Sequence, residues 1–93
     1  MSLEGKMLWI LKLAFQINPP KIKDIGERKT AVFVNYSPHC NLFNVYIFKG
    51  GWKSEGVPDE KYEVYTDEVD KASKMLDKVI KRLEAIERSE KDV

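Results

Sequence analysis

The chain has 93 residues, of which 43% are apolar and 33% are charged, and its formal net charge is +1. This length accommodates one hydrophobic core, so we expect residues 1–93 to form a single domain, and the composition excludes a disordered chain. The single cysteine excludes an internal disulfide. We therefore expect a folded cytoplasmic protein whose total charge by itself predicts no particular partner.

The most apolar segment is MLWILKLAF, residues 7–15. It is about half as long as a membrane-spanning helix and contains Lys12, so we expect neither a membrane span nor a membrane partner. No small-residue cleavage site follows it, which argues against a secretory signal. The residues before it, 1–6, are similar to an expression-tag prefix, and we set them aside as a prefix or a disordered segment.

The same segment alternates between two sets of side chains from Trp9 to Ile17, a period of two that predicts a strand. A helix would place Lys12 on one stripe with Leu8, Leu11 and Phe15, and this mismatch favours the strand. The strand would end at residues 18–20, Asn-Pro-Pro, because proline supplies no hydrogen-bond donor to a sheet.

Residues 30–36 (TAVFVNY) and 42–49 (LFNVYIFK) are rich in β-branched and aromatic side chains. Five residues separate them, so they predict a β-hairpin. Pro38 and Asn41 favour a turn, which places His39 and Cys40 at the tip of the hairpin.

The adjacent His39 and Cys40 are the only histidine and the only cysteine of the chain. A cysteine nucleophile needs a base within hydrogen-bond reach, and a zinc site needs about four ligands. Neighbouring residues in an extended chain point apart, and there is no second histidine to complete either arrangement. We therefore predict no catalytic residues, no metal site and no cofactor, and a protein that is not an enzyme.

After a glycine-rich loop that contains Trp52, residues 61–65 (KYEVY) predict a fourth strand, and residues 66–89 predict a long helix followed by a tail over 90–93. Acidic residues precede basic ones by four positions along this helix, as in Asp67 with Lys71 and Asp77 with Lys81, which is typical of a solvated helix face. The other face carries an apolar stripe with helical spacing: Val69, Ala72, Leu76, Val79, Leu83 and Ile86.

These elements predict an α+β fold in which a four-stranded antiparallel meander, residues 7–65, is covered on one face by the C-terminal helix. Residues 1–54 have a charge balance of +5 and residues 55–93 one of −4, so a basic sheet would dock against an acidic helix. The side chains expected to face the helix are Val32, Val34, Phe43, Val45 and Ile47, together with Leu11, Leu13 and Phe15.

The opposite face of this sheet would carry Phe33, Tyr46 and Phe48, with Trp52 in the loop beyond. Exposed aromatic side chains with a polar rim are typical of protein interfaces, so we predict an interaction module that forms a homodimer through this face. In the alternative, the rings stack single-stranded nucleic acid while lysines follow its backbone. Those lysines are Lys12, Lys29, Lys49 and Lys53. In a third arrangement the segment 18–28 closes the face.

The segments VNYSPHCNLFNVYIFKGGW and YEVYTDEVDKASKMLDKVIKRLEAI together span most of residues 30–86. This combination of a hairpin that ends in Gly-Trp, a short strand and a C-terminal helix resembles small uncharacterised proteins encoded by phages and prophages of bacteria. The resemblance implies a role in host interaction or as a nucleic-acid accessory protein. It carries no functional residue over to this chain.

Overall fold

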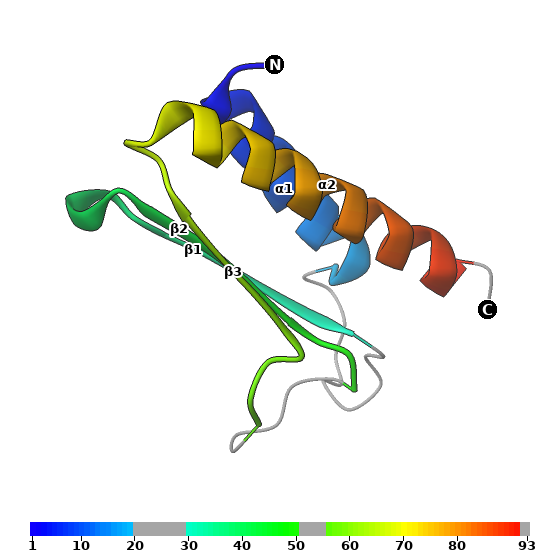
Figure 1. Cartoon of the computed structure of the whole chain (residues 1–93). Coiled ribbons are helices and arrows are strands. Elements are labelled where there is room, and N and C mark those ends of the chain that lie inside the picture. The colour runs from blue at the N-terminus through cyan, green and yellow to red at the C-terminus, as the bar shows by residue number, and fades with distance from the viewer. Residues whose placement is uncertain (20–29, 51–55, 92–93) are drawn as a thin grey trace.

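Two helices lie side by side on one face of a three-stranded antiparallel sheet (Figure 1). The computed structural model describes residues 1–19, 30–50 and 56–91. Its elements are α1 (Leu3–Ile17), β1 (Ala31–Ser37), the short 3-10 helix η2 (Pro38–Cys40), β2 (Leu42–Phe48), β3 (Glu60–Tyr65) and α2 (Val69–Lys91). The predicted α+β class, antiparallel sheet and long C-terminal helix are confirmed. Within the described residues, however, the sheet has three strands rather than four.

The first element is a helix, so the strand predicted from Trp9 to Ile17 is wrong. Ser2 begins the helix, since its side chain accepts a hydrogen bond from the Gly5 amide at 3.0 Å. The buried positions of α1 recur at the three- and four-residue steps of one helix face: Ile10, Leu13, Ala14 and Ile17. Residues 1–6, expected to be a prefix or a disordered segment, thus contain the cap and the first turn of α1.

The sheet has the order β1-β2-β3, and its hairpin agrees with the prediction. Val34 lies opposite Val45, which in turn lies opposite Tyr62. Between β1 and β2 the chain turns through η2, and Asn41 takes a left-handed conformation with φ of 54°. His39 and Cys40 are both exposed in this turn, as expected for the tip of a hairpin.

The core lies between the sheet and the two helices, with α1 packed on the β1 side and α2 on the β3 side (Figure 1). The predicted helix-facing residues of β1 and β2 do contribute to this core: Val32, Val34, Phe43, Val45 and Ile47. Leu11 and Phe15 were expected there too, but they point away from the core and are 38% and 54% exposed. Leu13 is buried as expected.

The helices run in the same direction, because contacts near their starts and near their ends connect them in order. Lys6 Nζ lies 2.9 Å from Asp77 Oδ1 and donates to Ser73 Oγ at 2.6 Å. Toward the other end, the Gln16 amide nitrogen lies within hydrogen-bond distance of the Glu87 carboxylate once the amide is oriented to donate. None of the helices in the described ranges combines the length and apolar character that a membrane crossing requires.

Candidate interaction surface

One stripe of α1 is apolar although it does not face the core. Leu8, Leu11 and Phe15 follow each other at steps of three and four residues and are 60%, 38% and 54% exposed. A helix that packs only on a core usually presents polar side chains on its outer side. Lys12 lies beside the stripe on α1, and its Nζ lies 5.0 Å from the centre of the Trp9 ring.

Strand β1 adds two exposed aromatic side chains beside this stripe, Tyr36 on the face of the sheet that carries α1 and Phe33 on the opposite face, so that they lie on either side of the sheet edge. Phe33 and Tyr36 are 42% and 50% exposed. Two grooves connect them to α1, one of about 330 Å³ that reaches Leu8 and Tyr36 and one of about 300 Å³ that reaches Phe15 and Phe33. Both grooves are lined by Leu11 and Val34. We call Leu8, Leu11, Phe15, Phe33 and Tyr36 the β1-side surface.

The backbone of β1 forms one edge of the sheet, and Asn18 binds the beginning of that edge. The Asn18 side chain accepts a hydrogen bond from the Val32 amide at 2.6 Å and donates one to the Thr30 carbonyl at 2.7 Å. Because main-chain groups alternate in direction along an antiparallel strand, Val34 and Tyr36 also direct their N–H and C=O away from β2. Among the described residues these outward groups have no hydrogen-bond partner.

The three predicted rings lie on the outer face of the sheet, away from the helices. Phe33 lies opposite Tyr46 in the register of the sheet, and the ring centres of Phe33 and Phe48 are 5.4 Å apart in an edge-to-face contact. They differ in exposure, since Phe33 is exposed, Tyr46 is half-buried and Phe48 is only 9% exposed. Trp52, the fourth predicted aromatic residue, lies outside the described residues.

Of the lysines in the nucleic-acid alternative, the two that the structure describes, Lys12 and Lys49, do not lie together along one face of the sheet. Lys12 belongs to α1 and therefore lies in the other layer of the fold, so its predicted place on the sheet face is wrong. Lys49 Nζ lies 3.9 Å from a Glu60 carboxylate oxygen. Lys61 lies over the Tyr46 ring but binds Glu63 at 2.9 Å, and that hydrogen bond raises the pKa of Lys61. Lys29 and Lys53 lie outside the described residues.

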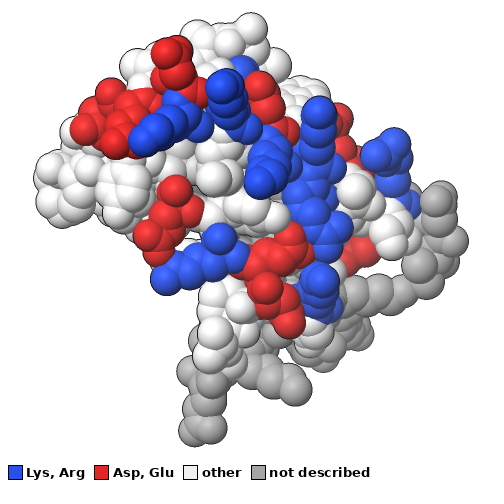
Figure 2. Space-filling view, viewed as in Figure 1, with Lys and Arg blue, Asp and Glu red and all other residues white. Residues whose placement is uncertain are grey.

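Charged side chains gather instead over α2 and β3, as Figure 2 shows. A groove of about 510 Å³ on α2 is lined by Lys71, Lys74, Met75, Asp77, Lys78 and Lys81. Asp77 binds Lys6 of α1 rather than Lys81, and Lys71 lies 3.9 Å from Glu68 rather than beside Asp67. The two expected pairs within the helix are therefore replaced by other contacts.

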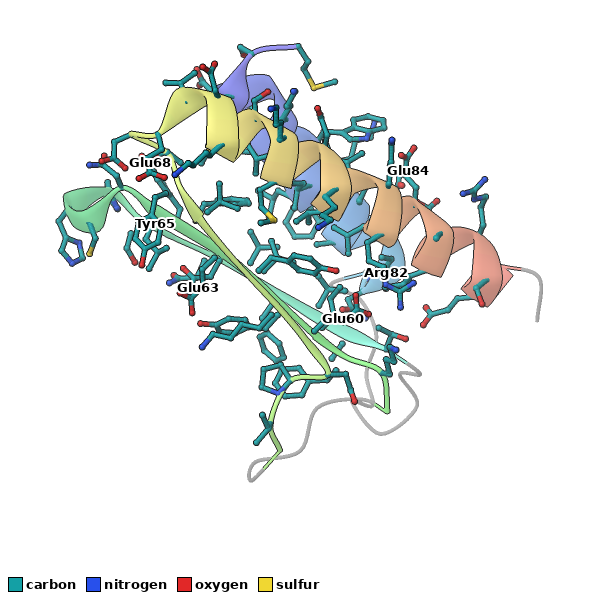
Figure 3. All side chains as sticks on the ribbon, viewed as in Figure 1. Glu60, Glu63, Tyr65, Glu68, Arg82 and Glu84 are labelled. Atoms are coloured by element: carbon teal, nitrogen blue, oxygen red, sulfur yellow. The ribbon has the colours of Figure 1, made fainter. Side chains whose placement is uncertain are left out.

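Glu60 and Arg82 point toward one another between β3 and α2 (Figure 3). Tyr62 also donates a hydrogen bond to Glu60 Oε1, at 2.7 Å. The Arg82 hydrogen bond lowers the pKa of the Glu60 carboxyl, against the opposing effect of burial, and burial together with the bond to Glu60 raises the pKa of Tyr62. These titratable groups bind one another and join two elements of the fold.

The described residues contain no group of three or more His, Cys, Asp or Glu side chains that could hold a metal ion. No protein-family model matches the chain, and searches of curated proteins and of solved structures gave no significant match. The resemblance to phage-encoded proteins therefore stays a prediction. The part of the surface that the sequence reasoning missed is the stripe of α1, although the spacing of Leu8, Leu11 and Phe15 is visible in the sequence.

Proposed function

We propose that the protein is a non-enzymatic interaction module that binds a protein partner through the β1-side surface. The observation that carries the proposal is the grouping of five large apolar side chains, each at least 38% exposed, around one strand and one helix. Covering such an area is favourable by roughly 25 cal/mol per Å², and contiguous apolar patches on proteins are typical of interaction sites.

The β1-side surface overlaps with the predicted outer face of the sheet, but it is centred on the edge formed by β1 and α1. Phe33 belongs to both surfaces. Phe48 and Tyr46 offer little accessible area, whereas Leu8 and Phe15 are each more than half exposed. A partner therefore buries more apolar area at the edge formed by β1 and α1 than on the rings alone.

The nucleic-acid alternative has less support. Stacking of bases requires exposed rings beside cations that are available to phosphates. On the outer face, Lys61 binds Glu63 and Lys49 lies near Glu60. Titration with single-stranded DNA and RNA at low and at physiological salt distinguishes nucleic-acid binding from the proposed protein interaction, since phosphate contacts weaken steeply as salt rises. We expect no salt-sensitive binding, and such binding would favour the alternative.

Selection from a displayed library of random peptides tests the proposed function on the whole protein. Peptides bind preferentially where they can bury apolar surface area, so we expect the selected peptides to bind the β1-side surface. Leu8→Gln and Phe15→Gln should each abolish this binding. Val69→Gln is the matched control, because Val69 is 58% exposed on α2, away from that surface. Peptides whose binding survives both α1 substitutions would overturn the proposal.

A further inference from the structure

We infer that the partner is a second copy of this chain, which pairs its β1 antiparallel to β1 across a two-fold axis at Asn35. The two three-stranded sheets then become one continuous sheet, and the two α1 helices meet above the junction. This inference rests on the proposed function, because it uses the β1-side surface, and it adds the identity of the partner and the geometry of the complex.

The two edges of the sheet differ in how they are protected. Exposed edge strands commonly carry charged residues that prevent pairing with another chain. The outward positions of β3 include Lys61 and Glu63, which bind each other, and charged side chains cover this side of the molecule (Figure 2). Strand β1, with the sequence AVFVNYS, has no charged residue and no proline. The unprotected edge is therefore β1.

The available length of the β1 edge selects a register. Asn18 already binds the Val32 amide, and Pro38, which follows the strand, has no N–H to offer. The outward N–H groups that need partners are thus those of Val34 and Tyr36. With the axis at Asn35, the Val34 N–H of one copy donates to the Tyr36 carbonyl of the other, and the Tyr36 N–H donates to the Val34 carbonyl.

In this arrangement the outward N–H and C=O groups of Val34 and Tyr36 are hydrogen-bonded in both copies. Each contact occurs twice, as an isologous dimer requires. A free edge of two residues offers few main-chain bonds to an added peptide. A second copy adds its own Leu8, Leu11 and Phe15 beside the strand, so it also covers the apolar stripe of α1. A second copy of the chain therefore covers both the β1 edge and the α1 stripe, whereas an isolated peptide strand would cover the edge alone.

Charge on α1 is arranged in agreement with a two-fold axis. Leu8 lines the groove that lies beside Val34 and Tyr36, close to the proposed axis. Glu4 and Lys12 lie four positions before and four positions after Leu8 on the helix. When two α1 helices meet antiparallel at Leu8, Glu4 of each copy lies beside Lys12 of the other, so opposite charges approach twice.

A matched pair of tyrosines tests this inference. Tyr36 and Tyr65 are 50% and 49% exposed, lie on the two edge strands, and both direct their N–H away from β2. Proline at either position removes an outward donor and no hydrogen bond of the sheet. We expect sedimentation equilibrium from micromolar to millimolar protein to show a monomer–dimer equilibrium. Tyr36→Pro should weaken it roughly 30-fold or more, because two hydrogen bonds are lost, and Tyr65→Pro should not.

Circular dichroism shows whether the proline variants fold. If one does not, lysine substitutions at the same two positions provide a second test. Tyr36→Lys should likewise give a monomer, and Tyr65→Lys should leave the dimer intact. A dimer that persists in Tyr36→Lys overturns strand pairing. A wild-type protein that stays monomeric at millimolar concentration also overturns it, whereas the proposed function would fail if the selected peptides did not bind the β1-side surface.

The native cysteine provides a direct measurement of the geometry. Cys40 is the only cysteine, is exposed, and lies five residues beyond the proposed axis. Spin labels on Cys40 in the two copies should be separated by roughly 25 Å, since each copy contributes the extended end of β1 and the 3-10 turn η2 between the axis and Cys40. A distance below about 20 Å would place the hairpin tips together and overturn the antiparallel pairing.

Discussion

The guanidinium of Arg82 binds both carboxylate oxygens of Glu60, with Nε 2.8 Å from Oε1 and from Oε2 and Nη2 2.7 Å from Oε2 (Figure 3). This contact joins α2 to β3. The Glu60 side chain is 17% exposed and that of Arg82 35%, so solvent screens the pair only in part. Charge-assisted, bidentate pairs of this kind are stronger than single hydrogen bonds.

Loss of this pair should destabilise the protein. We expect Arg82→Met to lower the free energy of unfolding by about 1 kcal/mol or more, because it leaves a half-buried carboxylate without its cation. Urea denaturation followed by circular dichroism measures the change. Glu63→Gln is the control, since it breaks the more exposed pair with Lys61 and should cause a smaller loss. Equal losses for both variants would show that Glu60 and Arg82 contribute no more than a surface pair.

The same contact predicts a pH dependence. The pKa of Glu60 lies below its ordinary value of 4.5, mainly because of the Arg82 hydrogen bond. The folded state therefore favours the carboxylate, and this stabilisation is fully present above the pKa of the unfolded chain and is lost as the pH falls through the lower, folded value. We expect the urea midpoint of the wild type to fall more steeply below about pH 4.5 than that of Glu60→Gln. Parallel declines in the two proteins would contradict the prediction.

The side chain of Asn18 supplies both a donor and an acceptor to the edge of β1, and the two can be separated by substitution. Asn18→Asp keeps the acceptor for the Val32 amide but loses the donor to the Thr30 carbonyl, and Asn18→Ala loses both. We expect Asn18→Ala to cost roughly 1–2 kcal/mol and Asn18→Asp to cost less. Thermal unfolding measures the order of stability. Amide exchange at Val32 should accelerate in Asn18→Ala but remain protected in Asn18→Asp.

The hairpin and its faces were predictable because side chains alternate regularly along two strands of β-branched and aromatic residues. Val34 and Val45 were both expected to face a helix, and they do. The C-terminal helix was predictable from one apolar stripe that continues without glycine or proline, although Val69, expected at the start of that stripe, is 58% exposed at the first residue of α2. In these segments a single period describes the pattern, so the local sequence specifies both the type of element and its buried side.

The first segment is ambiguous in the sequence because it is apolar on nearly every side, so a period of two and a period of 3.6 both describe it. Lys12 beside Leu8 and Leu11 argues against a helix only if that stripe is buried. That stripe is in fact the exposed one, and the buried stripe contains Ile10 and Leu13. The candidate surface was missed for the same reason, since its α1 part exists only when this segment is helical.

The exposed stripe of α1 could stabilise the monomer or bind a partner, and substitutions of Leu8 and Leu83 distinguish these two roles. Leu83 is fully buried and Leu8 is 60% exposed. Leu83→Ala should lower the free energy of unfolding by roughly 2–5 kcal/mol, because it leaves a cavity in the core. Leu8→Ala should change it by less than about 0.5 kcal/mol when urea denaturation is done at low micromolar concentration, where the monomer predominates.

The stripe should instead affect association. In sedimentation experiments at high concentration, Leu8→Ala should weaken the dimer although the monomer keeps its stability, because the lost area is covered only in the complex. If Leu8→Ala destabilised the monomer as much as Leu83→Ala does, Leu8 would contribute to folding rather than to binding. Leu8 would then stabilise the folded monomer, and the β1-side surface would not be supported as an interaction site.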